Sequence, residues 1–207
     1  MKIYKIVFIF MILICNSLYA DTYQELMKQG KKYFTERNSE FKKIGQGYKS
    51  DEAIKIFTKV CEAKNAKKVY RIKACENLMT IYAGNGVIDT GAKGSKKYKR
   101  IIELQDDEKK IKYAKMACDL DSAYGCIALG NYYKKGDGVE IDLDKTTQFY
   151  IKACKLQMSL CTNLGVYYEY TIKDIESALK VYKMVCEKDK KDSTRCVNYN
   201  RLREELE

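Results

Sequence analysis

Apolar residues recur along most of the chain at steps of three and four residues, as at Ile54, Phe57 and Cys61. This spacing places the apolar side chains on one face of an α-helix. Four such segments begin at an aspartate that suits the N-cap or the first helical turn: Asp51, Asp107, Asp144 and Asp174. The pattern therefore predicts an all-helical protein.

A stretch that contains two cysteines recurs along the chain. Three copies follow one another at cysteine steps of 32 to 36 residues, with Cys118 and Cys126, Cys154 and Cys161, and Cys186 and Cys196. An earlier copy, with Cys61 and Cys75, stands 57 and 51 residues ahead of them. The larger step predicts an insertion of roughly 16 to 20 residues near 86–106, and the regular steps indicate a solenoid of about four stacked repeats.

Each copy predicts two helices, the second of which starts near its cysteine and ends at glycines. Gly84 with Gly86, and Gly136 with Gly138, suit the left-handed conformation that closes a helix. Glycines 45 and 47 show the same spacing after a leading helix over about Tyr23 to Glu36. We expect residues 21–50 to form an N-terminal capping helix and loop, and residues 51–207 to form the repeats, since an end repeat has only one neighbour.

The first twenty residues are typical of a secretory signal peptide. They begin with Lys2 and Lys5, continue with an apolar run from Ile6 to Cys15, and end on the small residue Ala20. An uncleaved anchor helix is the alternative, but about ten apolar residues are too few to span roughly 30 Å of hydrocarbon. We therefore predict a secreted or periplasmic protein with no stable membrane span after cleavage of residues 1–20.

Removal of residues 1–20 leaves eight of the nine cysteines and lowers the formal net charge from +11 to +9. An even number of cysteines in an exported chain predicts disulfides. The absence of histidine excludes Ser-His and Cys-His nucleophile pairs and the common zinc hydrolases, so we expect no metal and no other cofactor. The lysines are spread along solvent faces, which favours a soluble surface, with attraction to an acidic partner as the alternative. Nucleic acid is not an expected partner of an exported protein.

Apolar and aromatic residues at helical spacing in the second helices are interpreted as core rather than as a binding site: Leu129, Tyr133, Leu164 and Tyr168. Gly130 and Gly165 lie inside these predicted helices, where a glycine costs about 1 kcal/mol. We expect both glycines to allow a close approach between neighbouring helices.

The repeats resemble a known family through a set of signature residues: Gly125, Cys126, Leu129, Gly130, Tyr133, Gly136, Gly138, Val139, Asp144, Lys145, Tyr150, Ala153 and Cys154. This string resembles the Sel1-like repeat, a relative of the tetratricopeptide repeat. One cysteine pair per repeat is similar to the secreted Helicobacter cysteine-rich protein family. The resemblance covers nearly all of the chain after residue 20 and implies a right-handed α/α solenoid of helix pairs, with one disulfide per repeat.

The last copy departs from the family pattern. Tyr199 and Asn200 stand where leucine and glycine are expected, and Tyr168–Ile172 lacks the double glycine. We expect residues 192–207 to act as the closing cap of the solenoid.

The cysteine positions within a copy predict how the disulfides pair. One cysteine lies in the last turn of the first helix and the other opens the second, so an antiparallel helix pair brings their Cα atoms within the roughly 4.4 to 6.8 Å that a disulfide needs. The predicted disulfides are Cys61 with Cys75, Cys118 with Cys126, Cys154 with Cys161, and Cys186 with Cys196. Each short loop contributes about 2 to 3 kcal/mol in the chain-entropy model.

A solenoid of this kind presents an extended concave surface that suits a peptide or a protein segment. By register with related repeats, the groove is predicted to be lined by Glu76, Thr80, Ile127, Asn131, Lys134, Thr162, Val166 and Glu169. A protein or peptide in this groove, or a cell-wall-related small molecule, is the expected partner. The protein is accordingly predicted to act as a binding or adaptor module.

The resemblance also implies a second hypothesis, since members of the cysteine-rich family are described as penicillin-binding proteins with β-lactamase activity. Serine β-lactamases need a Ser-x-x-Lys element, which Ser39 with Lys42 and Ser177 with Lys180 provide. Lys145, Thr146 and Thr147 fall one residue short of a Lys-Thr-Gly element. If the protein is an enzyme, a β-lactamase-type hydrolase is the expected class, and the sequence names no catalytic nucleophile.

Overall fold

Four of the described helices begin where a side chain accepts a hydrogen bond from a free N–H group of the first turn. This computed structural model describes residues 22–33, 50–84, 104–188 and 196–207. The side chains of Asp106, Ser122 and Asp142 each accept a hydrogen bond of 2.8 to 2.9 Å from a backbone N–H three residues later. Asp174 accepts in the same way from the N–H of Ser177 at 3.0 Å. The aspartates at 51, 107 and 144 lie in first helical turns, as predicted.

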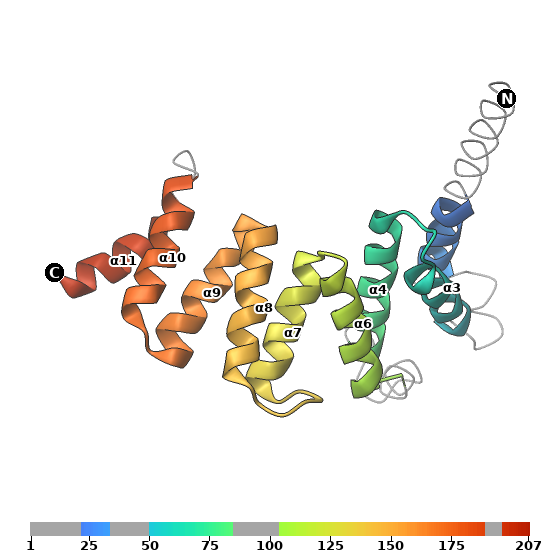
Figure 1. The fold of residues 1–207 in the computed structure, drawn as a ribbon, viewed down its shortest axis with the longest axis horizontal. Helices are drawn as coiled ribbons and strands as arrows, with labels where there is room; N and C mark the ends of the chain where they lie inside the picture. Colours follow the sequence, from blue (N-terminus) through green and yellow to red (C-terminus); the bar gives the residue numbers. More distant parts are fainter. Residues whose placement is uncertain (1–21, 34–49, 85–103, 189–195) are drawn as a thin grey trace, which may run out of the picture. The chain divides into compact units, whose positions relative to one another are not determined.

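The chain divides into two compact units, residues 1–120 and 121–207. The first unit contains a helix over residues 22–33, α3 (Ser50–Glu62), α4 (Lys68–Tyr82) and α6 (Asp107–Asp119). Helix α3 packs on α4, and α4 packs on α6 (Figure 1). Phe57, Leu78 and Tyr113 are among the buried core residues of this unit.

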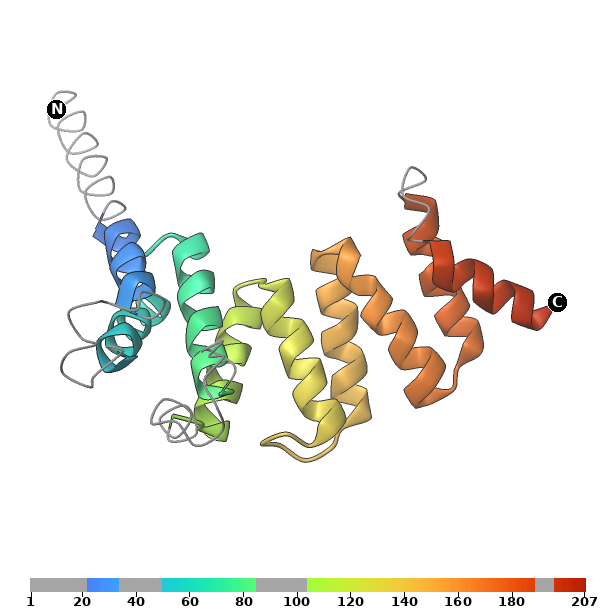
Figure 2. The same cartoon turned by 180° about the vertical axis from the view of Figure 1, so that it is seen from behind.

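The second unit contains α7 (Ala123–Lys135), α8 (Leu143–Leu156), α9 (Cys161–Tyr167), α10 (Ile175–Lys188) and α11 (Val197–Leu206). A 3₁₀ turn, η1 (Met158–Leu160), precedes α9, and a π-helical turn, η2 (Tyr168–Ile172), extends it. Each helix packs against the next one in the chain, as the view from behind also shows (Figure 2). No strand occurs in the ranges described, which confirms the all-helical prediction.

Three disulfides join the two helices of a repeat, at Cα–Cα distances of 5.1 Å for Cys61–Cys75, 4.3 Å for Cys154–Cys161 and 4.5 Å for Cys186–Cys196. Cys118 and Cys126 are also disulfide-bonded. The prediction of one disulfide per repeat is therefore confirmed.

Helix α4 differs from the prediction at its start. It begins at Lys68, so Cys75 lies two turns inside the helix, whereas the second helix was expected to open near its cysteine. The 14-residue separation of Cys61 and Cys75 is long enough to include these two turns. In the third repeat the separation is only 7 residues, and there Cys161 does open α9.

Helix ends follow the glycine prediction where the structure describes them. Gly84, Gly136 and Gly138 have φ angles of 72°, 70° and 79°, in the left-handed region. Glycines 45, 47 and 86 and most of the insertion lie outside the described residues. After η2, where the double glycine is missing, Lys173 takes the left-handed conformation instead, at φ 65°.

A candidate binding surface on the second helices

Buried tyrosines position the second helices of the second unit. A Cβ atom on Gly130 would lie 2.3 Å from the ring of Tyr150, and one on Gly165 would lie 2.4 Å from the ring of Tyr182. The Tyr150 ring on α8 therefore fills the space beside Gly130 on α7, and the Tyr182 ring on α10 fills the space beside Gly165 on α9. The predicted close approach at both glycines is confirmed.

The hydroxyl group of Tyr150 reaches from α8 to the surface residue Asn131 on α7. It donates a hydrogen bond of 2.5 Å to the amide oxygen of Asn131. Burial raises the pKa of Tyr150 to about 12, so the phenol stays a neutral donor. This bond fixes the Asn131 side chain with its amide NH₂ group directed away from Tyr150.

The outward surface of α7 and α9 has few charges. It carries Tyr124, Ala128 and Asn131 on α7, and Thr162, Asn163, Val166 and Tyr170 on α9 and η2; we call these seven residues the uncharged stripe. Tyr124, Val166 and Tyr170 are 53%, 40% and 56% exposed. Residues 128 and 131 recur at 163 and 166, one 35-residue step later, so the repeat places them on equivalent faces. The outward faces of α8 and α10, by contrast, carry exposed lysines and glutamates such as Lys155, Glu176 and Lys183.

The residues predicted to line the groove fall into three groups. Asn131, Thr162 and Val166 belong to the uncharged stripe, and Lys134 lies at its edge with its Nζ 6.0 Å from the centre of the Tyr150 ring. Ile127 and Glu169, each 6% exposed, are packed inside the unit and offer almost no surface to a partner.

The third group of predicted groove residues, Glu76 and Thr80, lies on α4 of the first unit. The Thr80 hydroxyl bonds the Glu76 backbone oxygen at 2.8 Å, and the Glu76 carboxylate pairs with Lys73 at 3.2 Å. Sequence reasoning missed four residues of the stripe: Tyr124, Ala128, Asn163 and Tyr170. Asn163 and Tyr170 stand three residues before and four residues after Val166 on one helical face.

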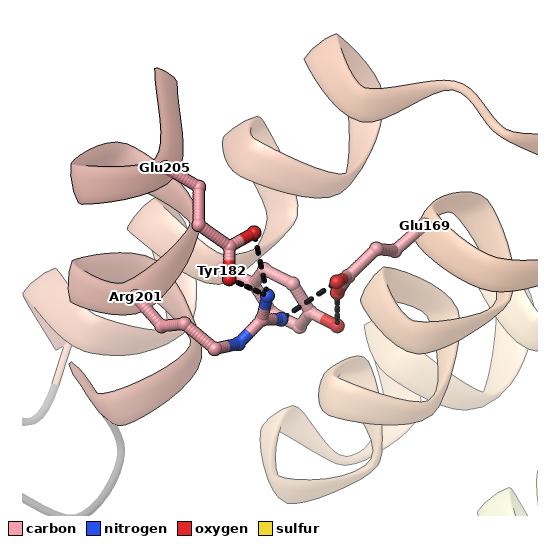
Figure 3. A network of polar contacts seen from close by, with 4 residues as sticks. All are labelled: Glu169, Tyr182, Arg201 and Glu205. Atoms are coloured by element: carbon pink, nitrogen blue, oxygen red, sulfur yellow. Dashed lines mark hydrogen bonds and ion pairs between the residues drawn. The ribbon is translucent and has the colours of Figure 1, made fainter. Parts of the chain in front are cut away.

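Glu169 is held by a polar network that Figure 3 shows. Its carboxylate accepts a hydrogen bond of 2.9 Å from the Tyr182 hydroxyl and one of 2.7 Å from Arg201, which also pairs with Glu205 at 3.0 Å. Burial raises the pKa of Glu169, but the bonds from Arg201, Tyr170 and Tyr182 outweigh it and hold that pKa below its usual value. Glu169 is thus an ionised internal group that fastens α11, rather than a free groove residue.

The Ser-x-x-Lys element of α10 serves the helix and is not arranged for nucleophilic catalysis. The Ser177 hydroxyl bonds Asp174 at the helix N-terminus, and Lys180 Nζ pairs with Glu176 Oε1 at 2.6 Å. This bond raises the pKa of Lys180, whereas a lysine that acts as a general base needs a lowered one. Ser39 and Lys42 lie outside the described residues.

Over the described part of the chain, no cluster of three or more cysteine, aspartate or glutamate side chains is arranged to hold a metal ion. Within the same ranges, no helix combines the length and apolar character needed to cross a membrane.

No family model matches the chain, and no curated protein matches its sequence. Its structure is similar to that of a protective antigen present in uropathogenic Escherichia coli strains, described as displaying an SLR fold. The two are 18% identical and superpose with a TM-score of 0.53 over 80% of this chain and 30% of the antigen. The chain has the Sel1-like repeat fold.

A second similar structure is a Sel1 repeat protein from Oxalobacter formigenes, 19% identical, with a TM-score of 0.35 over 89% of this chain and 88% of that one. The chain spans about a third of the length of the E. coli antigen, so the shared fold extends over only part of that protein. The resemblance to the Helicobacter cysteine-rich family stays a prediction.

Proposed function

We propose that this protein is an exported, non-catalytic binding module that holds a protein segment on the uncharged stripe of its second unit. The observation that carries the proposal is the composition of the stripe. Charged residues make up 32% of the chain, yet these seven surface residues include none, and two are exposed tyrosines. Tyrosine and asparagine supply amphipathic contact area and hydrogen bonds at protein interfaces.

Export is supported by the disulfides. All eight cysteines after residue 20 are disulfide-bonded, and such bonds persist in oxidising compartments. The apolar segment after Lys2 and Lys5 supports the same route as a signal peptide, with the mature chain released to the periplasm or beyond. The oxidised helix pairs present the stripe on rigid elements, which lowers the entropy lost on binding.

A matched pair of variants tests the proposal. Val166 and Met184 are both 40% exposed apolar residues on helix surfaces, but only Val166 belongs to the stripe. Peptides are selected from a displayed random library on the oxidised protein, and their Kd values are measured against the wild type, Val166→Glu and Met184→Glu. We expect Val166→Glu to weaken binding about tenfold or more, because it places a charge inside the contact, and Met184→Glu to leave it within about twofold. Equal effects of the two variants, or no selectable peptide, would contradict the proposal.

A further inference from the structure

The π-helical turn η2 connects the uncharged stripe to α11. Tyr170, the last residue of the stripe, lies in this turn, and its hydroxyl bonds the carboxylate of Glu169 beside it. Glu169 in turn accepts the 2.7 Å bond from Arg201 of α11 (Figure 3). The preceding residue, Tyr168, packs against the core cluster to which α11 contributes Leu202. A residue of the stripe is therefore joined to α11 through its two neighbours in sequence.

The turn η2 relies on contacts with its surroundings. A π-helical turn is rare, and the residue that ends this one, Lys173, takes the left-handed conformation at φ 65° without being a glycine. Such a backbone persists only when the surrounding structure holds it. Glu169 is the buried residue of the turn, so its bonds to Arg201 and Tyr182 are among the contacts that hold η2.

Helix α11, on the other side of these contacts, is short and lightly packed. It has ten residues, and an isolated helix of that length is marginal in water. Its one buried residue in the described structure is Leu202. The Cys186–Cys196 disulfide ties the start of α11 to α10, and it thereby keeps Arg201 close to Glu169.

The same disulfide is accessible to a reductant. Both of its cysteines are partly exposed, whereas the cysteines of the preceding repeat, Cys154 and Cys161, are buried. Thiol–disulfide exchange needs direct access of the attacking thiolate to a sulfur atom. The covalent link that holds α11 is thus one that a dithiol can open while the preceding repeat stays closed.

We propose that reduction of the Cys186–Cys196 disulfide regulates the uncharged stripe: a dithiol reductant releases α11, and Tyr170 loses the contacts that hold it in place for a partner. The inference rests on the proposed function, since it concerns the same surface. The reductant is the dithiol form of a thiol–disulfide oxidoreductase in the compartment to which the chain is exported. The oxidised protein is the form that binds.

The exchange balances with such a dithiol. Its first thiolate attacks one sulfur of the pair and forms a mixed disulfide, and the other cysteine leaves as a thiolate that takes a proton. Its second thiolate then attacks the mixed disulfide and releases the first cysteine, which also takes a proton. The reductant gives up two electrons and two protons and becomes a disulfide, while Cys186 and Cys196 become thiols.

Release of α11 acts on Tyr170 through Glu169. Without the Arg201 guanidinium, the Glu169 carboxylate has lost its charged partner and is drawn toward water. The Tyr170 hydroxyl bonds this carboxylate, so it loses its fixed position at the same time. A partner must then order the tyrosine again when it binds, and this cost weakens binding.

The test measures peptide binding and amide exchange in both redox states. Peptides selected on the oxidised protein are titrated before and after brief treatment with dithiothreitol, at a dose for which alkylation and mass spectrometry show only Cys186 and Cys196 as reduced. The same Kd values are measured for a Cys186→Ser with Cys196→Ser double variant, and for Arg201→Gln beside Arg203→Gln. Both arginines lie on α11 and pair with a glutamate, but only Arg201 bonds Glu169. Circular dichroism checks that each variant keeps its helix content.

We expect reduction to raise the Kd about fivefold or more, because only part of the reduced population keeps Tyr170 in place. The double variant should bind equally weakly with and without dithiothreitol. Arg201→Gln should weaken binding about threefold or more, and Arg203→Gln should leave it within about twofold. Amide hydrogen exchange at residues 168–172 should become faster on reduction, since η2 loses its support.

An unchanged Kd after reduction of this pair alone would overturn the proposal, and so would a response to dithiothreitol that persists in the double variant. The absence of any dose that reduces this pair alone would overturn it too. If the double variant loses its helix content, the wild-type and arginine measurements decide. Failure of the proposed function shows separately, as equal effects of Val166→Glu and Met184→Glu in the oxidised protein, and it would overturn both proposals.

Discussion

At the residue scale, the contacts between tyrosine and glycine explain more of this structure than any other feature. Gly130 and Gly165 have ordinary helical backbones, so conformational freedom is not the reason for glycine there. The reason is space, because the rings of Tyr150 and Tyr182 occupy the volume that a Cβ atom would need. Each glycine lowers the intrinsic stability of its helix, but it leaves room for an aromatic ring to be buried there.

Replacement of Gly130 by alanine tests this account. Alanine is the better helix former by about 1 kcal/mol, but its Cβ overlaps the Tyr150 ring, so we expect the free energy of unfolding to fall by about 2 kcal/mol. Urea denaturation measures the change. In a Tyr150→Leu background, where the ring is absent, the same substitution should be neutral or stabilising. A similar loss in both backgrounds would show that the ring is not the cause.

The Glu169 carboxylate provides a pH-dependent contribution to stability. Because its folded pKa lies below the ordinary value of 4.5, its ionised form stabilises the protein above that pH, and this contribution is lost as the pH falls through the folded pKa.

We expect Glu169→Gln to cost about 1 to 2 kcal/mol at pH 7, since Arg201 loses its buried partner. Denaturation curves should show the gap to the wild type closing as the pH falls below about 4.5 and through the folded pKa of Glu169. Glu205→Gln, at an exposed pair, is the control and should cost less than about 1 kcal/mol. A gap that does not change with pH would contradict the assignment.

At the element scale, α11 is attached differently from the other helices. Leu202 is its one buried residue among those the structure describes, and it joins Ala178 and Tyr182 in a small core cluster. The ion pair with Glu169 and the Cys186–Cys196 disulfide supply the rest of the attachment. Helix α11 therefore depends more on its ion pair and its disulfide, and less on buried side chains, than α8 and α9, which each have four buried residues.

The same disulfide is predicted to be reduced first. Cys186 and Cys196 are both partly exposed, whereas the six other disulfide-bonded cysteines after residue 20 are buried. Brief treatment with dithiothreitol, followed by alkylation and peptide mass spectrometry, should label Cys186 and Cys196 before the rest, since exchange requires access of the attacking thiolate. Simultaneous labelling of all eight cysteines would show that reduction needs global unfolding instead.

At the scale of the whole molecule, the sequence predicts the repeats well and the site only in part. Apolar spacing, glycine positions and cysteine steps repeat locally, so helix pairs and their disulfides can be read from them. Glu169 was assigned to the groove by register, yet Arg201, 32 residues away, takes it into an internal network. Register places a backbone position on a face, but it does not reveal which distant side chain will pair with it.

The close contacts between tyrosine and glycine also have a consequence for how this gene can change length. Equivalent positions in the first unit, at residues 79 and 114, hold a buried methionine on α4 and a buried alanine on α6, so the large side chain stands on the opposite partner there. A recombination between repeats that set α4 beside α8 would place Met79 against Tyr150, and the reverse exchange would leave a void between Gly130 and Ala114. A change in repeat number that creates one of these two junctions is therefore penalised unless both sides of the junction change together, whereas loss of α8 and α9 would set Gly130 beside Tyr182 and keep the sizes matched.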